Sequence, residues 1–206
     1  MAAEEHGTGF NPGPSLPDLA VKDHIIDLTF PHRWRAEILP SRPLILPRLH
    51  LSYPAYAEEV ERGALEVLIH PDQNTQPFLA TCALGFRAPE VPTGLWSAPN
   101  PDEICVVSGG YCYLIDTTDP TGFTMIVFRP VLEVRPLLEH GLLLFAGHRK
   151  LLAWGVNGRA WQSEKLSDEG LTITAIRGKE LDGQGWDMLT DKETPFTLEL
   201  ETGKRV

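Results

Sequence analysis

Residues 142–161, LLLFAGHRKLLAWGVNGRAW, contain the pattern that decides the fold. Two apolar runs, over residues 142–146 and 151–154, flank a polar corner, GHRK. Short apolar runs separated by a glycine and polar residues are typical of two strands joined by a turn. The dipeptide Asn157-Gly158 tolerates positive φ, so it predicts a tight hairpin turn that leads to a third strand around Trp161.

The composition extends this β prediction to the rest of the chain. The 206 residues include 18 prolines, which disfavour long helices and favour short strands and turns. With 42% hydrophobic and 22% charged residues, the chain is an ordinary globular protein. We expect a flexible lead-in segment over residues 1–20, rich in Gly, Pro and Glu, and a single β-rich domain over residues 21–206.

Local patterns place the main elements between these limits. Ser52 as a cap, Pro54 in the first turn and Gly63 as a stop predict one short helix over residues 52–63. Residues 64–69 and 78–86 read as two strands that pair, and the proline-rich residues 87–103 as a long connection that carries Trp96. Near the C-terminus, apolar and polar residues alternate over 171–175 and 196–200, which predicts half-exposed antiparallel strands. Asp182-Gly183 predicts a turn between them.

The strand–glycine corner–strand pattern occurs twice. Residues 104–116, ICVVSGGYCYLID, repeat the order of the 142–161 stretch, and Gly109 aligns with Gly147 at a spacing of 38 residues. The pattern resembles a blade of a β-propeller, in which a glycine corner precedes an apolar strand and Gly-x-x-Trp follows, here residues 158–161. This resemblance implies a small propeller-like arrangement, while a sandwich or a barrel of antiparallel sheets remains an alternative.

Charge and cysteine usage limit the partners and the compartment. The formal net charge of −10 argues against a nucleic-acid binder, which needs clustered Lys and Arg. The chain has neither a run of about 20 apolar residues nor a signal-peptide pattern, so we expect no membrane association. The three cysteines, Cys82, Cys105 and Cys112, favour core thiols in a reducing compartment, and a cytoplasmic location is the expectation.

The leading hypothesis is a non-enzymatic module that binds a partner protein or has a regulatory role. The chain has no zinc-protease, phosphate-loop or dinucleotide-binding motif, so we expect no metal and no cofactor. Aromatic and arginine side chains are typical anchors of protein interfaces. The candidate binding residues are therefore Trp34, Trp96, Trp186, Arg33 and Arg35. A small-molecule ligand remains open.

Two further hypotheses remain. A hydrolase or carbohydrate-acting enzyme could use Asp182, Asp187 and Asp191 around Trp186, because paired carboxylates beside an aromatic ring suit a glycosidase site. This alternative requires at least two of these carboxylates to share a cleft with the ring, one with a raised pKa. A structural or regulatory subunit without a ligand of its own would instead present a large exposed apolar patch.

Overall fold

The computed structural model describes residues 24–55, 63–72 and 76–206, and almost all of its regular structure is strand. The expected lead-in over residues 1–20 lies outside these ranges. The strands are β1 (Ile25–Asp27), β2 (Trp34–Leu39), β3 (Leu49–Tyr53), β4 (Ala64–Pro71), β5 (Phe78–Ala83), β6 (Gly94–Ser97), β7 (Glu103–Ser108), β8 (Tyr111–Asp116), β9 (Phe123–Met125), β10 (Glu133–Leu137), β11 (Leu142–Ala146), β12 (Leu151–Gly155), β13 (Gly158–Gln162), β14 (Leu171–Arg177), β15 (Glu180–Asp187) and β16 (Lys192–Glu199). One 3₁₀ turn, η1 (Leu138–His140), precedes β11, and no helix in the described ranges has the length and apolarity to cross a bilayer.

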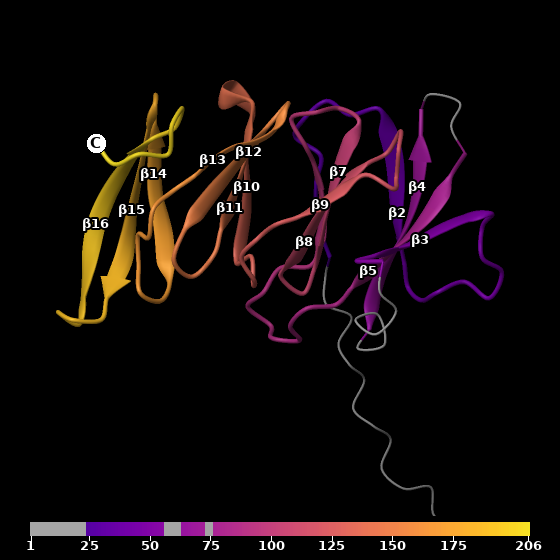
Figure 1. Ribbon diagram of the computed structural model, residues 1–206, viewed down its shortest axis with the longest axis horizontal. Coiled ribbons are helices and arrows are strands. Elements are labelled where there is room, and N and C mark those ends of the chain that lie inside the picture. Colours follow the sequence, from indigo (N-terminus) through magenta and orange to yellow (C-terminus); the bar gives the residue numbers. More distant parts are fainter. Residues whose placement is uncertain (1–23, 56–62, 73–75) are drawn as a thin grey trace, which may run out of the picture.

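The strands form four sheets that stand side by side (Figure 1). The first sheet has the order β2-β4-β5-β3, the second β1-β6-β7-β8-β9, the third β10-β11-β12-β13 and the fourth β14-β15-β16. The mainly β prediction with antiparallel sheets is confirmed, and none of the described sheets closes into a barrel.

The first strand of the described residues, β1, belongs to the second sheet. Strand β1 pairs in parallel with β6, opposite Gly94, Leu95 and Trp96, and the whole first sheet lies between these two strands in the sequence. Gly94 is required here, because a Cβ at this position would lie 1.9 Å from the carbonyl oxygen of Ile25. The β1–β6 pairing therefore ties the first sheet to the second at both ends.

Three apolar cores lie between consecutive sheets. Along β11, Leu143 and Phe145 belong to the core shared with the second sheet, whereas Leu142 and Leu144 belong to the core shared with the fourth. Successive side chains of a strand point to opposite faces, so a strand buried on both faces must be apolar at every position. This is why the runs at residues 142–146 and 104–107 are continuous rather than alternating.

The two end sheets turn polar faces outward. In β16, Phe196 and Leu198 are buried against the third sheet, while Thr197 on the opposite face donates a hydrogen bond of 2.8 Å to Asp182. In the first sheet, Thr81, on the face opposite the core, donates a hydrogen bond of 2.6 Å to Glu66, and both residues are buried beneath the β2–β3 side of this face. Terminal units of stacked folds need such polar outer faces.

The hairpins around the two glycine corners occupy the same place in consecutive sheets. Gly109 follows β7 and Gly147 follows β11, which are the second strands of the β6–β9 and β10–β13 meanders. The third strand around Trp161 is confirmed as β13. The turn between β12 and β13 is shifted by one residue, with Val156-Asn157 at its centre and Gly158, at φ 99°, paired with Gly155. The register shift between Ala153 and Trp154 leaves Ala160 of β13 as the extra residue of a bulge.

Three predicted elements differ from the structure. The expected helix over residues 52–63 does not start at Ser52, because Ser52 and Tyr53 complete β3 beside β5, and residues 56–62 lie outside the described ranges. The connection over residues 87–103 contains β6, so Trp96 lies in a strand. Asp182-Gly183 is not a turn but the middle of β15, where a Cβ on Gly183 would meet the Phe196 ring at 2.3 Å.

The three cysteines are buried and unlinked by disulfides, as expected for core thiols. Cys105 and Cys112 lie in the core between the second and third sheets, with their sulfur atoms 3.5 Å apart. Burial raises the pKa of the Cys82 and Cys112 thiols well above the ordinary value, so both remain protonated at neutral pH.

Glu103, at the start of β7, links three sheets. Its backbone carbonyl accepts a hydrogen bond of 3.1 Å from the Trp34 indole of the first sheet, and its carboxylate accepts one of 2.8 Å from the Trp154 indole of the third. Burial raises the pKa of Glu103 above the ordinary 4.5, and the Trp154 hydrogen bond opposes this rise. The ionised carboxylate is therefore held at a cost in stability.

We expect the Glu103→Gln variant to remove this cost. A raised folded-state pKa makes the wild type lose stability as the pH rises from about 4.5 through the folded value, because the unfolded chain releases its proton first. Glutamine still accepts the Trp154 hydrogen bond but does not ionise. The melting temperature of the variant relative to wild type should therefore be higher at pH 7 than at pH 4, and an equal difference at both pH values would contradict the assignment.

Candidate functional site

Two of the predicted binding tryptophans are core residues. Trp34 is 1% exposed and packs between the first and second sheets, and Trp96 is 2% exposed and packs between the second and third. Both rings therefore contribute to sheet packing rather than to the surface. The same apolar bulk that suits an interface anchor also suits a core, and the local sequence does not distinguish them.

The two predicted arginines lie at the first sheet. Arg33 forms an ion pair of 2.5 Å with Asp102, and its backbone pairs with Pro101 and Asp72. Arg35 is exposed on β2 and lines a shallow pocket with Glu37 and His70. Trp186 lies in the fourth sheet at the other end of the stack, so the five predicted residues are not brought together (Figure 1).

The three aspartates near Trp186 have separate structural partners. Asp182 pairs with Arg177 and Thr197, and Asp191, in a turn with φ 51°, accepts a hydrogen bond of 3.2 Å from the Trp186 indole. Asp187 accepts hydrogen bonds from the backbone of Leu189 and from Thr190. Of the three, only Asp187 lines the pocket beside Trp186.

The electrostatics of this pocket do not match those of a general acid. The hydrogen bonds from Thr190 lower the pKa of Asp187 below its ordinary value, whereas the hydrolase hypothesis requires one raised carboxyl pKa. A carboxylate that caps a turn is a common structural arrangement. The geometry therefore gives no support to catalysis by Asp182, Asp187 and Asp191.

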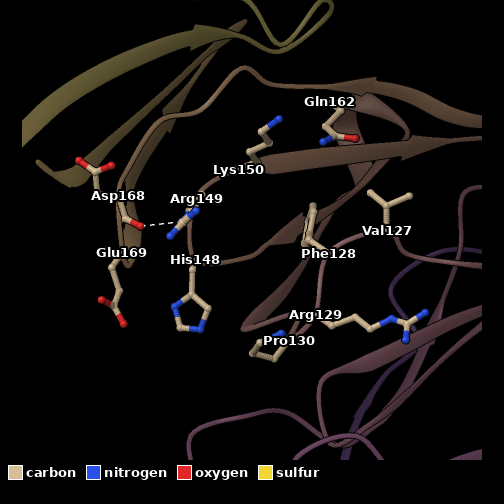
Figure 2. Close-up of a pocket in the computed structure, with 10 residues that line it drawn as sticks. All are labelled: Val127, Phe128, Arg129, Pro130, His148, Arg149, Lys150, Gln162, Asp168 and Glu169. Atoms are coloured by element: carbon tan, nitrogen blue, oxygen red, sulfur yellow. Dashed lines mark hydrogen bonds between the residues drawn. The ribbon is translucent and has the colours of Figure 1, made fainter. Parts of the chain in front are cut away.

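A larger pocket, of about 550 Å³, lies where loops of the second, third and fourth sheets meet (Figure 2). Three segments line it: the β9–β10 loop, the β11–β12 turn, and the β13–β14 connection together with the end of β13. We call this site the basic pocket. Its lining residues are Val127, Phe128, Arg129, Pro130, His148, Arg149, Lys150, Gln162, Asp168 and Glu169.

Phe128 forms the apolar part of the basic pocket, and the glycine corners fix its position. A Cβ on Gly147 would lie 2.7 Å from the Phe128 ring, so the ring packs directly on the glycine backbone. Gly110 is equally close to Pro130, whose Cβ would lie 2.6 Å from a Cβ at Gly110, and Val131 donates a backbone hydrogen bond of 2.8 Å to the Gly110 carbonyl. Gly147, and Gly110 beside the corner glycine Gly109, thus also shape this pocket.

The opposite wall of the basic pocket is held on two sides. The Arg149 Nε donates a hydrogen bond of 2.8 Å to the Asp168 carbonyl, which Figure 2 shows as a dashed line. The Leu166 amide donates one of 2.8 Å to the Arg149 carbonyl. On the other side, the Asp168 amide donates to the Trp186 carbonyl, and the Met188 amide donates to the Asp168 carboxylate. These bonds preorganise the β13–β14 connection between the third and fourth sheets.

The basic pocket concentrates positive charge on a chain whose formal net charge is −10. Arg129, Arg149 and Lys150 line it, and Lys165 pairs with Asp168 at its edge. The Lys165 hydrogen bond lowers the pKa of Asp168, so this carboxylate is ionised and already paired. Glu169 is the only other acidic residue among those that line the pocket.

Sequence reasoning identified the GHRK corner but assigned it no function. The available signal was three consecutive basic or histidine residues at a hairpin tip in an acidic chain. Metal binding was not expected, and among the described residues no group of three or more His, Cys, Asp or Glu is arranged to hold a metal ion.

Comparisons with known proteins give a structural similarity and no family. No protein-family model matches the sequence, and no curated protein matches it. Among solved structures, the chain is similar to the N-terminal domain of Nup159, with 12% sequence identity and a TM-score of 0.36. The match covers 90% of this chain and 53% of that one, so this chain spans about half the length of that domain.

Proposed function

We propose that the chain is a non-enzymatic protein-binding module whose basic pocket holds an acidic segment of a partner protein. The observation that carries this proposal is the group of cationic side chains around Phe128 on an otherwise acidic chain. Complementary charge steers a partner to such a site and rejects like-charged ones.

The chemistry of the lining favours binding over reaction. The lining residues include neither a hydroxyl nor a thiol side chain, so a serine-type or cysteine-type nucleophile is not among them. Arginine and lysine side chains offer N–H donors to carboxylates, and Arg149 has one of its donors already engaged in fixing the wall. The Arg129 guanidinium lies 4.9 Å above the Tyr111 ring and donates to the Met125 sulfur. Lys150 and the other donors of Arg149 are therefore the groups that suit recognition of carboxylates.

An apolar shelf adjoins the basic pocket. Val127 is 64% exposed and also lines a neighbouring pocket of about 280 Å³ with Met125, Trp154 and Arg159 among its other residues. A bound segment could thus place an apolar side chain against Val127 and Phe128 next to its carboxylates. The proposed ligand is an extended peptide with Asp or Glu residues beside one apolar residue.

The test is a titration of the full chain with fluorescein-labelled peptides of this composition, followed by fluorescence anisotropy. We expect a Kd on the order of micromolar, and a loss of roughly tenfold in affinity between about 0.05 and 0.3 M salt, because exposed charge pairs are screened. A peptide with Asn and Gln in place of Asp and Glu should bind at least about tenfold more weakly, since the charge-assisted bonds are lost.

The matched control reverses charge away from the pocket. Lys192, in β16, and Lys204, which follows it, are exposed and do not line the basic pocket, so Lys192→Glu/Lys204→Glu changes the net charge without touching the proposed site. This variant should bind the acidic peptide within about threefold of wild type. Equal binding of the acidic and amide peptides, or an equal loss in the control, would refute the proposal.

A further inference from the structure

The loop between β2 and β3 displays three consecutive aliphatic side chains to solvent. Leu44 is 104% exposed, Ile45 89% and Leu46 41%. Figure 1 shows this purple loop projecting at the end of the stack that the first sheet forms. Single exposed aliphatic residues are ordinary, but three in a row at a protruding tip form an apolar patch of the kind that marks an interaction site.

The loop is constrained on both sides of this patch. Pro43 and Pro47 flank the three aliphatic residues, and each has a fixed φ and no N–H donor. Among the described residues, no backbone hydrogen bond is formed by residues 41–47. The tip is therefore restricted by its prolines while its backbone polar groups remain available, which lowers the entropy that binding must remove.

The base of the loop packs on a buried polar chain. His50 Nε2 lies 2.9 Å from the Thr81 hydroxyl, which donates to Glu66, and the Arg42 guanidinium lies 3.4 Å from His50 Nε2. Burial and then the nearby Arg42 lower the pKa of His50, so the imidazole is neutral at pH 7. This arrangement anchors the loop to the outer face of the first sheet.

Two exposed arginines, Arg42 and Arg48, border the patch in the sequence RPLILPR. A partner that covers the patch would meet a cation on each side of the aliphatic residues. An apolar groove with carboxylates at its rim matches this pattern in both shape and charge.

We propose that the 42–48 loop is a docking element that inserts into an apolar, acid-rimmed groove of a partner protein. A protein is favoured over a membrane because the chain carries a net charge of −10, and an anionic lipid surface would repel it. The loop belongs to the first sheet, whereas the basic pocket is built from loops of the second, third and fourth sheets. The two sites can therefore fail independently.

The experiment uses the full chain as its own probe. A photo-crosslinking residue, Ser41→p-benzoyl-L-phenylalanine, is placed beside the patch, the chain is irradiated in native cell extract, and the crosslinked protein is identified by mass spectrometry. The identified protein is then purified and titrated with wild-type chain and with Leu44→Ser/Ile45→Ser/Leu46→Ser. We expect the triple variant to bind at least about 100-fold more weakly, since each buried aliphatic side chain contributes about tenfold or more.

Matched controls separate the loop from general hydrophobicity and from charge. Met188 and Leu189 are 63% and 90% exposed in the turn between β15 and β16, so Met188→Ser/Leu189→Ser removes similar apolar surface elsewhere and should leave the affinity unchanged. Arg42→Glu/Arg48→Glu should lower the affinity and its salt dependence together. A synthetic peptide of residues 40–49 should compete with the chain.

Four outcomes would overturn the proposal. The first is that no protein is crosslinked above the level found in extract without irradiation, and the second is that the triple variant binds the identified protein as tightly as the wild-type chain. The third is that the chain dimerises through this loop in sedimentation. The fourth is that the loop binds phosphatidylcholine vesicles, with or without phosphatidylserine. Because all substituted residues are exposed, circular dichroism of each variant should match wild type.

Discussion

The Phe145→Ala variant is expected to lose about 3–5 kcal/mol of unfolding free energy. Phe145 is fully buried in β11, in the core between the second and third sheets. The strand lies between β10 and β12, where Phe145 is paired with Val134 and Leu152, and neither neighbour can collapse into the space without breaking the ladder. A typical domain is stable by only about 5–15 kcal/mol, so the change is large.

Urea unfolding followed by tryptophan fluorescence measures this loss. Val156 is 56% exposed in the turn after β12, and Val156→Ala should change the unfolding free energy by less than about 0.5 kcal/mol. If Phe145→Ala also cost less than about 1 kcal/mol, the second and third sheets would not pack through this core as described.

Reversal of charge at the β11–β12 turn should have the largest effect on binding. The Arg149→Glu/Lys150→Glu variant replaces two cations of the basic pocket by anions next to Glu169, and we expect at least a 100-fold weaker Kd for the acidic peptide, about 2.7 kcal/mol. The result is measured by the same anisotropy titration.

Single variants separate charge from structure in this loss. Arg149 also fixes the Asp168 carbonyl, so part of the effect of its removal is structural. Arg149→Lys keeps the charge and gives up the planar donor geometry, so it should cost only a fewfold. Lys150→Glu, which leaves the Arg149 bond in place, should cost about tenfold by itself. If Arg149→Lys weakened peptide binding as much as the double reversal, the role of Arg149 would be only to hold the Asp168 carbonyl in place.

Strands that depend on their own residues alone could be predicted from the sequence. The runs around the GHRK corner became β11, β12 and β13 because continuous apolar strands with a glycine between them have few alternatives. Gly183 misled the prediction for a non-local reason, since the Phe196 ring on the neighbouring strand requires a residue without a side chain there. The position of Trp96 in a strand also has a non-local cause. Its strand β6 is short and proline-flanked, and β6 forms only because β1 and β7 pair with it on its two sides.

The basic pocket could not be predicted from local sequence patterns. Its walls come from three loops separated by up to about 40 residues, and the packing of Phe128 on Gly147 becomes visible only when the sheets are stacked. Of the residues proposed from sequence, Trp34 and Trp96 were chosen because aromatic side chains on turn-rich segments are typical of interfaces, but a core uses the same side chains. A basic hairpin tip on an acidic chain was the stronger clue, because the core never requires it.

The parallel pairing of β1 with β6 makes the two ends of the stack unequal. The first sheet is an insertion between β1 and β6, two strands of the second sheet that pair with each other. The chain therefore leaves the second sheet and returns to it, and the first sheet forms a long loop that the β1–β6 pairing closes. The fourth sheet is joined to the third by a single passage of the chain. The first sheet, which carries the docking loop, is therefore joined to its neighbour by two chain connections, whereas the fourth sheet is joined by one connection and by the core that it shares with the third.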